Sequence, residues 1–158
     1  LRPVDLVEIT EDSLGFFEID AGARMDEIQL ERKFPNAPLI CKTDPEQIQQ
    51  IMLNLLHNAV QAMPGEGTLT VSIQEVDTQT DLRTHLNRPC VALEVSDTGM
   101  GMSDDVKTNL FMPFFTTKED GNGLGLATAK KVIEAHNGDI VAESGPNAGS
   151  TFTIYIPK

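Results

Sequence analysis

Apolar residues recur along the chain with two different periods, and these periods predict both helices and strands. A 3.6-residue spacing predicts an amphipathic helix over residues 6–21, in spite of Gly15. Asp44-Pro45 fits the start of a second, longer helix, which Pro64-Gly65 ends. The remaining predicted helices are a short one over 103–110 and a longer one over about 124–136, capped by Asn137-Gly138.

Segments of alternating or continuous apolar residues predict the strands. These are residues 28–34, 39–43, 68–76, 90–96, 139–144 and 150–157. The polar, aperiodic stretch 77–89 reads as a surface hairpin loop, and the last two strands turn through residues 145–149. Because several neighbouring strands are hairpin-connected and helices intervene elsewhere, the pattern favours a two-layer α/β sandwich, with a mixed β-sheet and helices on one face.

Composition narrows the class of protein. The chain has 158 residues, 40% of them hydrophobic and 23% charged, which suits a single globular domain over residues 1–158. Its formal net charge of −12 argues against nucleic acid and against anionic membrane surfaces as partners. An anionic ligand would then need local devices: backbone amides, a helix N-terminus or a bridging metal ion.

The cysteines and the termini bear on location. Cys41 and Cys90 lack metal-ligand spacing, and we expect free thiols in a reducing, cytoplasmic compartment. No apolar run reaches the roughly 20 residues of a membrane span, and no signal peptide is visible. Since the chain begins with Leu1 rather than Met, we expect a fragment or a processed product.

A carboxylate and two glycines follow the strand 90–96. By the two-residue period of a strand, Asp97 lies on the same side as that strand's apolar residues, where it needs a donor. The exocyclic amine of adenine is such a donor, whereas guanine presents a carbonyl. Gly99 and Gly101 let the backbone approach a flat base. The alternative is an ordinary Asp-Gly turn.

A second glycine cluster, Gly121-Asn122-Gly123-Leu124-Gly125, opens the helix over about 124–136. A run of amides at a helix N-terminus suits a di- or triphosphate. The cluster is not a Rossmann fingerprint, because the spacing fails at Thr128 and no strand precedes it; the chain also has no Walker A sequence. The alternative is a flexible hinge, and a lid over the site would need one.

The long helix carries three amide side chains on one face, and an aperiodic segment follows the first glycine cluster. Asn54, Asn58 and Gln61 stand at i, i+4 and i+7 among aliphatic residues, where an amide oxygen is a suitable Mg²⁺ ligand. The alternative is a solvated polar stripe. In the aperiodic segment 111–118, Lys118 can reach phosphate oxygens, and a lone surface lysine is the alternative.

Four of these motifs occur in the order found in sensor histidine kinases. Asn54–Ala59 resembles the N box, Asp97–Gly101 the first glycine box, Phe111–Phe114 the F box and Gly121–Leu126 the second glycine box. The resemblance extends over essentially the whole chain. The short lid, with only two residues between Lys118 and Gly121, most resembles nitrogen-regulation-type kinases. The wider GHKL ATPase superfamily, which includes gyrase-like ATPases and clamp chaperones, shares an α/β sandwich fold.

The resemblance also implies roles for residues and a lid over about 102–124. Asn58 would ligate Mg²⁺, Asn54 would support the phosphate end, and Lys118 would meet phosphates; these three form the implied catalytic set. Asp97 would accept from adenine, and Ser150 would help to hold water against it. Many family members have a basic residue at Gln61, so one phosphate contact is expected to be weaker here. The implied ATP-site residues are Asn54, Asn58, Gln61, Asp97, Gly99, Met100, Gly101, Phe114, Thr117, Lys118, Gly121, Gly123, Leu124, Gly125, Leu126 and Ser150.

The resemblance implies the catalytic ATP-binding domain of a sensor histidine kinase. His57, His85 and His136 are the chain's histidines, and none has the family's acceptor context. We therefore expect the acceptor on a helical dimerisation domain that is absent here, with a response regulator receiver domain as the next acceptor. The isolated chain should be a monomer that binds ATP with little turnover, and its parent a homodimer. Whether the parent is attached to a membrane is left open.

Three rival functions remain open at this point. A GHKL-type ATPase that drives a clamp would place a glutamate near the start of the N box, where this chain has Asn54. An anti-sigma-type serine kinase shares the nucleotide pocket, although the segment 111–118 favours the histidine kinase. A non-catalytic docking module would not need an intact nucleotide constellation.

Overall fold

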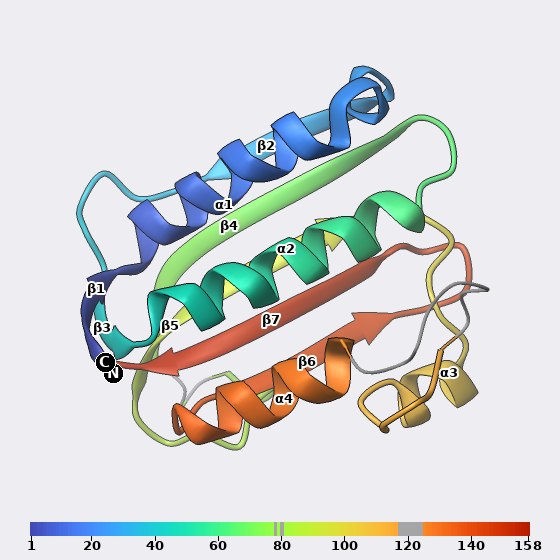
Figure 1. The fold of residues 1–158 in the computed structure, drawn as a ribbon. Coiled ribbons are helices and arrows are strands. Elements are labelled where there is room, and N and C mark those ends of the chain that lie inside the picture. The colour runs from blue at the N-terminus through green and yellow to red at the C-terminus, as the bar shows by residue number, and fades with distance from the viewer. Residues whose placement is uncertain (78, 80, 117–124) are drawn as a thin grey trace.

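A five-stranded mixed sheet organises the chain, of which the computed structural model describes residues 1–77, 79, 81–116 and 125–158. Figure 1 shows its strands running side by side, and their order is β2-β4-β5-β7-β6. The first pair, β2 and β4, is parallel, and all other neighbours are antiparallel. Their bounds are β2 (Ile28–Lys33), β4 (Gly67–Asp77), β5 (Pro89–Asp97), β6 (Asp139–Ser144) and β7 (Ser150–Pro157).

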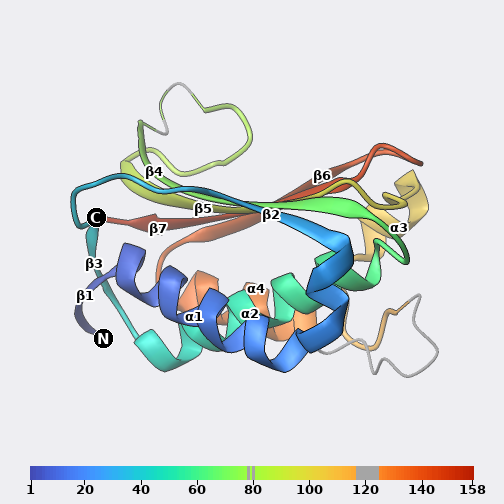
Figure 2. The same cartoon turned by 90° about the horizontal axis from the view of Figure 1, so that it is seen from above.

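Three helices cover one face of this sheet, and Figure 2 shows them together in a second layer. They are α1 (Leu6–Ala21), α2 (Pro45–Gln61) and α4 (Gly125–Ala135). Their apolar residues pack on the inward residues of the strands in one main core. The two-layer α/β sandwich with helices on one face is confirmed. Among the described residues, no helix has the length and apolarity that crossing a bilayer requires.

Smaller elements complete the chain. The strands β1 (Arg2–Asp5) and β3 (Ile40–Thr43) form a separate antiparallel pair, and a 3₁₀ helix η1 (Gly22–Glu27) follows α1. The short helix α3 (Asp104–Asn109) lies below the right-hand end of the sheet in Figure 1. Each predicted strand and helix occurs in the structure, with bounds that differ by no more than a few residues.

Local capping explains where the helices begin and end. The Asp44 carboxylate accepts hydrogen bonds from the first-turn N–H groups of α2, and Pro45 takes its first position. At the end of α4, Asn137 adopts a left-handed conformation with φ of 58°, and the Gly138 N–H donates to the Ile133 carbonyl at 2.9 Å. The predicted cap is confirmed, and this turn directs the chain into β6.

The loop between β4 and β5 does more than join them. It was predicted as a surface hairpin loop, and β4 and β5 are indeed antiparallel. However, the loop folds back over the outer face of the sheet, as Figure 2 shows. Tyr155 is fully buried beneath it, in a small cluster with Cys90 and Ala92. The sequence pattern alone did not predict this second cluster.

Both cysteines are free and buried. Burial raises the pKa of the Cys41 thiol to about 11, so this thiol stays protonated at neutral pH. The expectation of unpaired cysteines is confirmed.

Candidate functional site

A cavity of about 440 Å³ opens near the end of the sheet where β5 finishes. It lies among α2, the first turn of α4 and the segment that contains α3, which Figure 1 places toward the same end of the sheet. Its lining residues are Asn54, Asn58, Gln61, Ala62, Asp97, Met100, Gly101, Met102, Val106, Leu110, Phe115, Thr116, Gly125, Leu126, Ser150 and Phe152.

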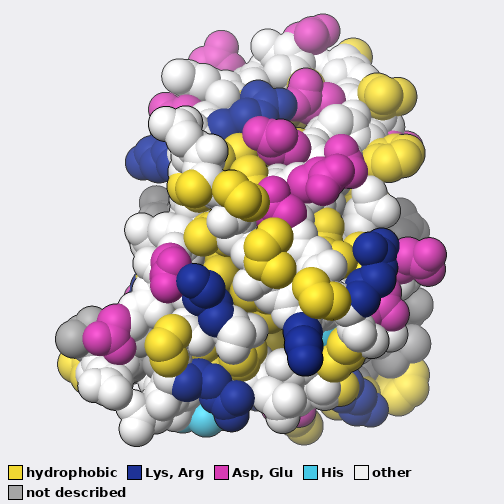
Figure 3. All heavy atoms as spheres, turned by 90° about the vertical axis from the view of Figure 1, so that its left-hand side faces the viewer, with side chains coloured by type: hydrophobic (Ala, Val, Ile, Leu, Met, Phe, Trp, Pro, Cys, Tyr) yellow, Lys and Arg dark blue, Asp and Glu magenta, His cyan; other side chains and the backbone are white. Residues whose placement is uncertain are grey.

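The charge of the lining is unusual for a site that would hold an anion. No Lys or Arg occurs among the described residues that line this cavity. Lys and Arg side chains are found instead at the end of the molecule with both termini, where Figure 3 shows them among Asp, Glu and apolar side chains. A hollow at that end is lined in part by Lys42, Arg88 and Lys158. The described part of the cavity must therefore attract an anion through amides, a helix end or a metal ion.

Asp97 is the carboxylate of the cavity, and its side chain lies inside, as the strand period predicted. The residue is 7% exposed. Its carboxylate accepts from the Gly99 N–H at 2.9 Å and from the N–H of Ser150, the residue opposite it on β7. Burial raises its pKa, and the two N–H groups offset part of that shift. A charged form of Asp97 is therefore costly until a further donor reaches it.

The glycines after β5 allow protein backbones to approach one another. A Cβ on Gly99 would lie 2.2 Å from the Ala62 carbonyl oxygen, and one on Gly101 would lie 1.8 Å from the Gly145 oxygen. Gly101 also has a φ of 68°, which favours glycine. These glycines were expected to let the backbone approach a flat base. The structure gives another reason, because both are required where this loop packs between the end of α2 and the β6–β7 turn.

The predicted amide face of α2 is confirmed, since Asn54, Asn58 and Gln61 all line the cavity. The Asn54 Nδ2 atom is buried and has no hydrogen-bond partner among the described residues. A Cβ on Gly125 would lie 2.9 Å from both amide atoms of Asn54. Glycine at the start of α4 therefore makes room for this amide, and it brings the N-terminal end of the helix, which is electropositive, to the cavity wall.

The segment after the first glycine cluster differs in part from the prediction. Phe114 was proposed as a site residue, but its side chain is 76% exposed and does not line the cavity. The next residues, Phe115 and Thr116, line it instead. Phe114 has a φ of 66°, and this turn of the backbone directs the two phenylalanines differently. The aperiodic sequence gave no period from which their directions could have been predicted.

Other lining residues were missed, although the sequence carried a signal for some. Val106 and Leu110 are four residues apart, so they share one face of α3, and both line the cavity together with Met102, which precedes the helix. Phe152 lies two residues after Ser150 and therefore on the same side of β7, and it also lines the cavity.

The predicted residues thus divide into three groups. The cavity brings together Asn54, Asn58, Gln61, Asp97, Met100, Gly101, Gly125, Leu126 and Ser150. Two do not line it: Gly99 packs on the end of α2, and Phe114 is exposed. The rest lie outside the described residues, namely Thr117, Lys118, Gly121, Gly123 and Leu124.

Comparison with known proteins agrees with this geometry. Residues 43–158 match the model of the family "Histidine kinase-, DNA gyrase B-, and HSP90-like ATPase". The sensor histidine kinase ZraS of Klebsiella oxytoca is 38% identical over 99% of this chain and 31% of its own length. The sensor protein FixL of Bradyrhizobium diazoefficiens is 40% identical over 87% of this chain and 26% of its own.

A solved structure supports the same relationship. The catalytic domain of the histidine kinase ThkA superposes with a TM-score of 0.81 at 30% identity, covering 99% of this chain and 94% of that one. The present chain spans about a third of the length of the curated relatives it matches. It belongs to the family of histidine kinase-, DNA gyrase B- and HSP90-like ATPases, as a catalytic ATP-binding domain of the sensor histidine kinase kind.

Proposed function

We propose that this chain binds Mg·ATP in the cavity and that, in a longer protein, it transfers the γ-phosphoryl group to a histidine on a helical domain outside the chain. One observation carries the proposal. The same cavity holds a buried carboxylate acceptor, Asp97, and a buried amide donor, Asn54 Nδ2, that has no partner within the part of the chain that the structure describes. ATP offers complementary groups, an amine on its base and oxygens on its phosphates.

Asp97 would read the base. Its carboxylate can only accept, so it favours the exocyclic amine of adenine over the carbonyl of guanine. The cost of burying the charge is offset when the amine donates to it. Apolar side chains such as Leu110, Leu126 and Phe152 line the same cavity and would exclude water around the base.

The amides of α2 would meet the phosphates and the metal ion. Asn54 Nδ2 is a donor that a phosphate oxygen would satisfy, and the Asn58 side-chain oxygen is a hard ligand of the kind Mg²⁺ accepts. Among the described residues, no group of three or more His, Cys, Asp or Glu could hold a metal ion by itself. Mg²⁺ is commonly bound by few protein ligands together with substrate phosphates. When bound, it would neutralise charge on the phosphates.

Catalysis would then consist mostly of positioning and charge neutralisation, because phosphoryl transfer leaves little covalent chemistry to the protein. Lys118 and the amides of Gly123 and Gly125 were predicted to contact the phosphates. Lys118 and Gly123 lie outside the described residues, Gly125 lines the cavity, and all three contacts stay predictions. The lid over about 102–124 and the likeness to nitrogen-regulation-type kinases also stay predictions.

The three histidines support an acceptor outside the chain, because each already has a partner. His57 Nε2 lies 3.2 Å from an Asp20 carboxylate oxygen, and His85 Nδ1 lies 3.2 Å from one of Asp139. His136 is 5% exposed, and its ring nitrogens lie 3.1 and 2.7 Å from two backbone atoms. We therefore expect the isolated chain to bind ATP with little turnover, whereas robust phosphorylation of one of these histidines would contradict the proposal.

The wider assignment follows from the resemblance and the relatives. A response regulator receiver domain would take the phosphoryl group from the helical domain. The parent would be a homodimer with this domain in the cytoplasm, and the isolated chain would be a monomer. Adding the helical domain in a phosphotransfer assay tests this step, and transfer to a serine partner instead would favour the serine kinase alternative.

Calorimetric titration with Mg·ATP and Mg·GTP tests the binding proposal directly. We expect the wild-type chain to prefer ATP, and Asp97→Asn to weaken ATP binding about 30-fold, the loss of one hydrogen bond to a charged group, about 2 kcal/mol. Asp12→Asn, an exposed position on α1, removes the same charge and should leave the affinity unchanged. Binding that is indifferent to the base and to Asp97 would mean that the cavity does not read adenine.

A further inference from the structure

Ser144, the last residue of β6, has a hydroxyl group with three hydrogen-bond contacts at the edge of the cavity. The Met102 N–H donates to its Oγ at 2.8 Å. The Oγ also lies 2.7 Å from the Gly149 carbonyl oxygen and 2.9 Å from the Ser150 Oγ. Of these partners, Met102 and Ser150 line the cavity, while Ser144 itself does not.

A count of hydrogens fixes the direction of these bonds. A serine hydroxyl has one hydrogen to donate, and a backbone carbonyl oxygen can only accept. The contact with Gly149 therefore uses the hydrogen of Ser144. Ser144 must then accept from Ser150, so that the hydroxyl hydrogen of Ser150 is also committed, away from any ligand.

We propose that Ser144 is a positioning residue that holds the Ser150 hydroxyl as an acceptor and thereby sets the preference of the cavity for a base with an exocyclic amine. This inference rests on the proposed function. Asp97 and Ser150 are opposite each other on β5 and β7, and both line the cavity. With Ser144 in place, both side chains present only lone pairs to a ligand, directly or through a water molecule. An amine satisfies such a pair, and a carbonyl does not.

The fold around Ser144 does not depend on its hydroxyl alone. The β6–β7 turn is also held to the glycine loop by backbone bonds, from Asn147 N–H to the Met100 oxygen at 2.7 Å and from Gly149 N–H to the Gly99 oxygen at 3.2 Å. Removing the hydroxyl should therefore leave the turn in place. It would free the Ser150 hydroxyl to rotate and to donate.

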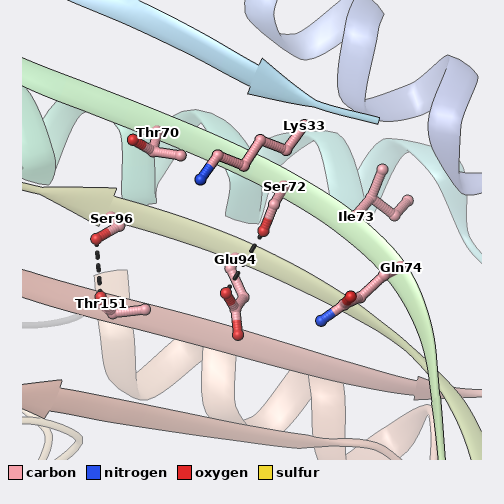
Figure 4. A pocket seen from close by; sticks show the side chains of 8 residues that line it. All are labelled: Lys33, Thr70, Ser72, Ile73, Gln74, Glu94, Ser96 and Thr151. Carbon is pink, nitrogen blue, oxygen red and sulfur yellow. Dashed lines mark hydrogen bonds between the residues drawn. The ribbon is translucent and has the colours of Figure 1, made fainter. Parts of the chain in front are cut away.

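A matched control is available next to Asp97 on β5 and next to Ser150 on β7, where the neighbouring side chains lie on the other face of the sheet. Ser96 and Thr151 face each other on β5 and β7, and their hydroxyl oxygens are 2.8 Å apart. Figure 4 shows this pair beside a polar hollow on the outer face, with the side chains of Thr70, Ser72 and Glu94 around it. Ser96→Ala thus breaks a comparable hydrogen bond between two hydroxyl groups on β5 and β7 without altering a residue of the cavity.

The test compares the Kd values of Mg·ATP and Mg·ITP for the full chain, since inosine replaces the amine of adenine with a carbonyl. For Ser144→Ala we expect the ratio of the ITP to the ATP Kd to fall about tenfold, the worth of about one hydrogen bond. Ser144→Cys keeps the shape but bonds weakly, so its ratio should fall as well. Ser144→Thr keeps the hydroxyl and should keep the wild-type ratio, as should Ser96→Ala.

The outcomes separate this inference from the proposed function. If wild-type protein does not prefer ATP to ITP, the proposed function fails. If it does, but Ser144→Ala and Ser144→Cys weaken both nucleotides equally, Ser144 is a structural residue only and the inference is overturned. Thermal unfolding of each variant shows whether it is folded; should Ser144→Ala fail to fold, Ser144→Cys against Ser144→Thr decides.

Discussion

Two carboxylates on opposite faces of the sheet, Asp81 and Asp97, have opposite surroundings. Asp81, in the β4–β5 loop over the outer face, accepts from two nitrogens of the Arg83 guanidinium at 2.9 and 2.8 Å and from the Tyr155 hydroxyl at 2.7 Å. Asp97, at the end of β5 on the inner face, accepts from two backbone N–H groups, and no described residue forms an ion pair with it.

The electrostatic consequences are opposite as well. The guanidinium of Arg83 holds the pKa of Asp81 well below its usual range, whereas burial raises the pKa of Asp97. The charged form of Asp81 therefore stabilises the fold, and the charged form of Asp97 costs stability. A carboxylate whose hydrogen bonds are all supplied by the protein therefore stabilises the fold, while one left short of donors is available to a ligand.

The largest effect on stability is expected from Arg83→Met, which removes the cation from Asp81 and Glu94. Arg83 also donates to Glu94 at 2.8 Å, so two partly buried carboxylates would lose their partner. We expect the free energy of unfolding to fall by about 2 kcal/mol, less than for a fully buried pair. Urea unfolding measures it, and ATP affinity should not change.

Arg32→Met is the matched control for this substitution. Arg32 pairs with Glu18, and both side chains are more than 40% exposed, at 45% and 41%. Its loss should cost less than about 0.5 kcal/mol. Equal losses in the free energy of unfolding for Arg83→Met and Arg32→Met would show that the ion pairs of Arg83 in the β4–β5 loop stabilise the fold no more than an exposed ion pair does.

Tyr155→Phe should have a smaller effect, about 1.5 kcal/mol, because one hydrogen bond to the charged Asp81 is lost. Burial, together with Asp81, raises the pKa of Tyr155 above its ordinary value. The stability that this hydroxyl contributes is therefore present below about pH 10 and is lost as the pH rises further. Unfolding measured against pH should show this alkaline loss in wild type and not in Tyr155→Phe.

Unfolding measured against pH also tests Asp81, whose contribution to stability is lost at low pH rather than at high pH. Since its pKa is lowered in the folded state, its contribution is present above about pH 4 and is lost as the pH falls below that value. Tyr155 is the chain's single tyrosine, so tyrosinate absorbance reports its ionisation directly. Ionisation of Tyr155 at an ordinary pKa, without unfolding, would contradict a buried hydrogen bond from the Tyr155 hydroxyl to Asp81.

The smallest effect, and one of opposite direction, is expected from Asp97→Asn. Replacing a buried carboxylate that is short of donors should raise the free energy of unfolding by about 1 kcal/mol at neutral pH, while ATP binding weakens about 30-fold. Because the pKa of Asp97 is raised in the folded state, the gain should shrink as the pH falls and the wild-type carboxyl takes up its proton. A decrease in stability at neutral pH would place Asp97 with Asp81 as a structural group.

The sequence was informative about features that depend on near neighbours in the chain. Helix and strand periods predicted the elements, and strand alternation placed Asp97 on the inner face. Helical spacing likewise brought Asn54, Asn58 and Gln61 to one face, where they line one cavity. These predictions succeeded because a backbone period fixes the direction of each side chain relative to the residues next to it.

Contacts between distant segments were decided only by the tertiary structure. No period indicated that Phe115 rather than Phe114 would line the cavity, or that the β4–β5 loop would fold back over Tyr155. The glycines after β5 and the bonds of Ser144 also depend on segments about 40 residues apart in sequence, as Met102 and Ser144 are. Their positions follow from how the β6–β7 turn packs on the end of β5, and a local pattern of residues does not contain that packing.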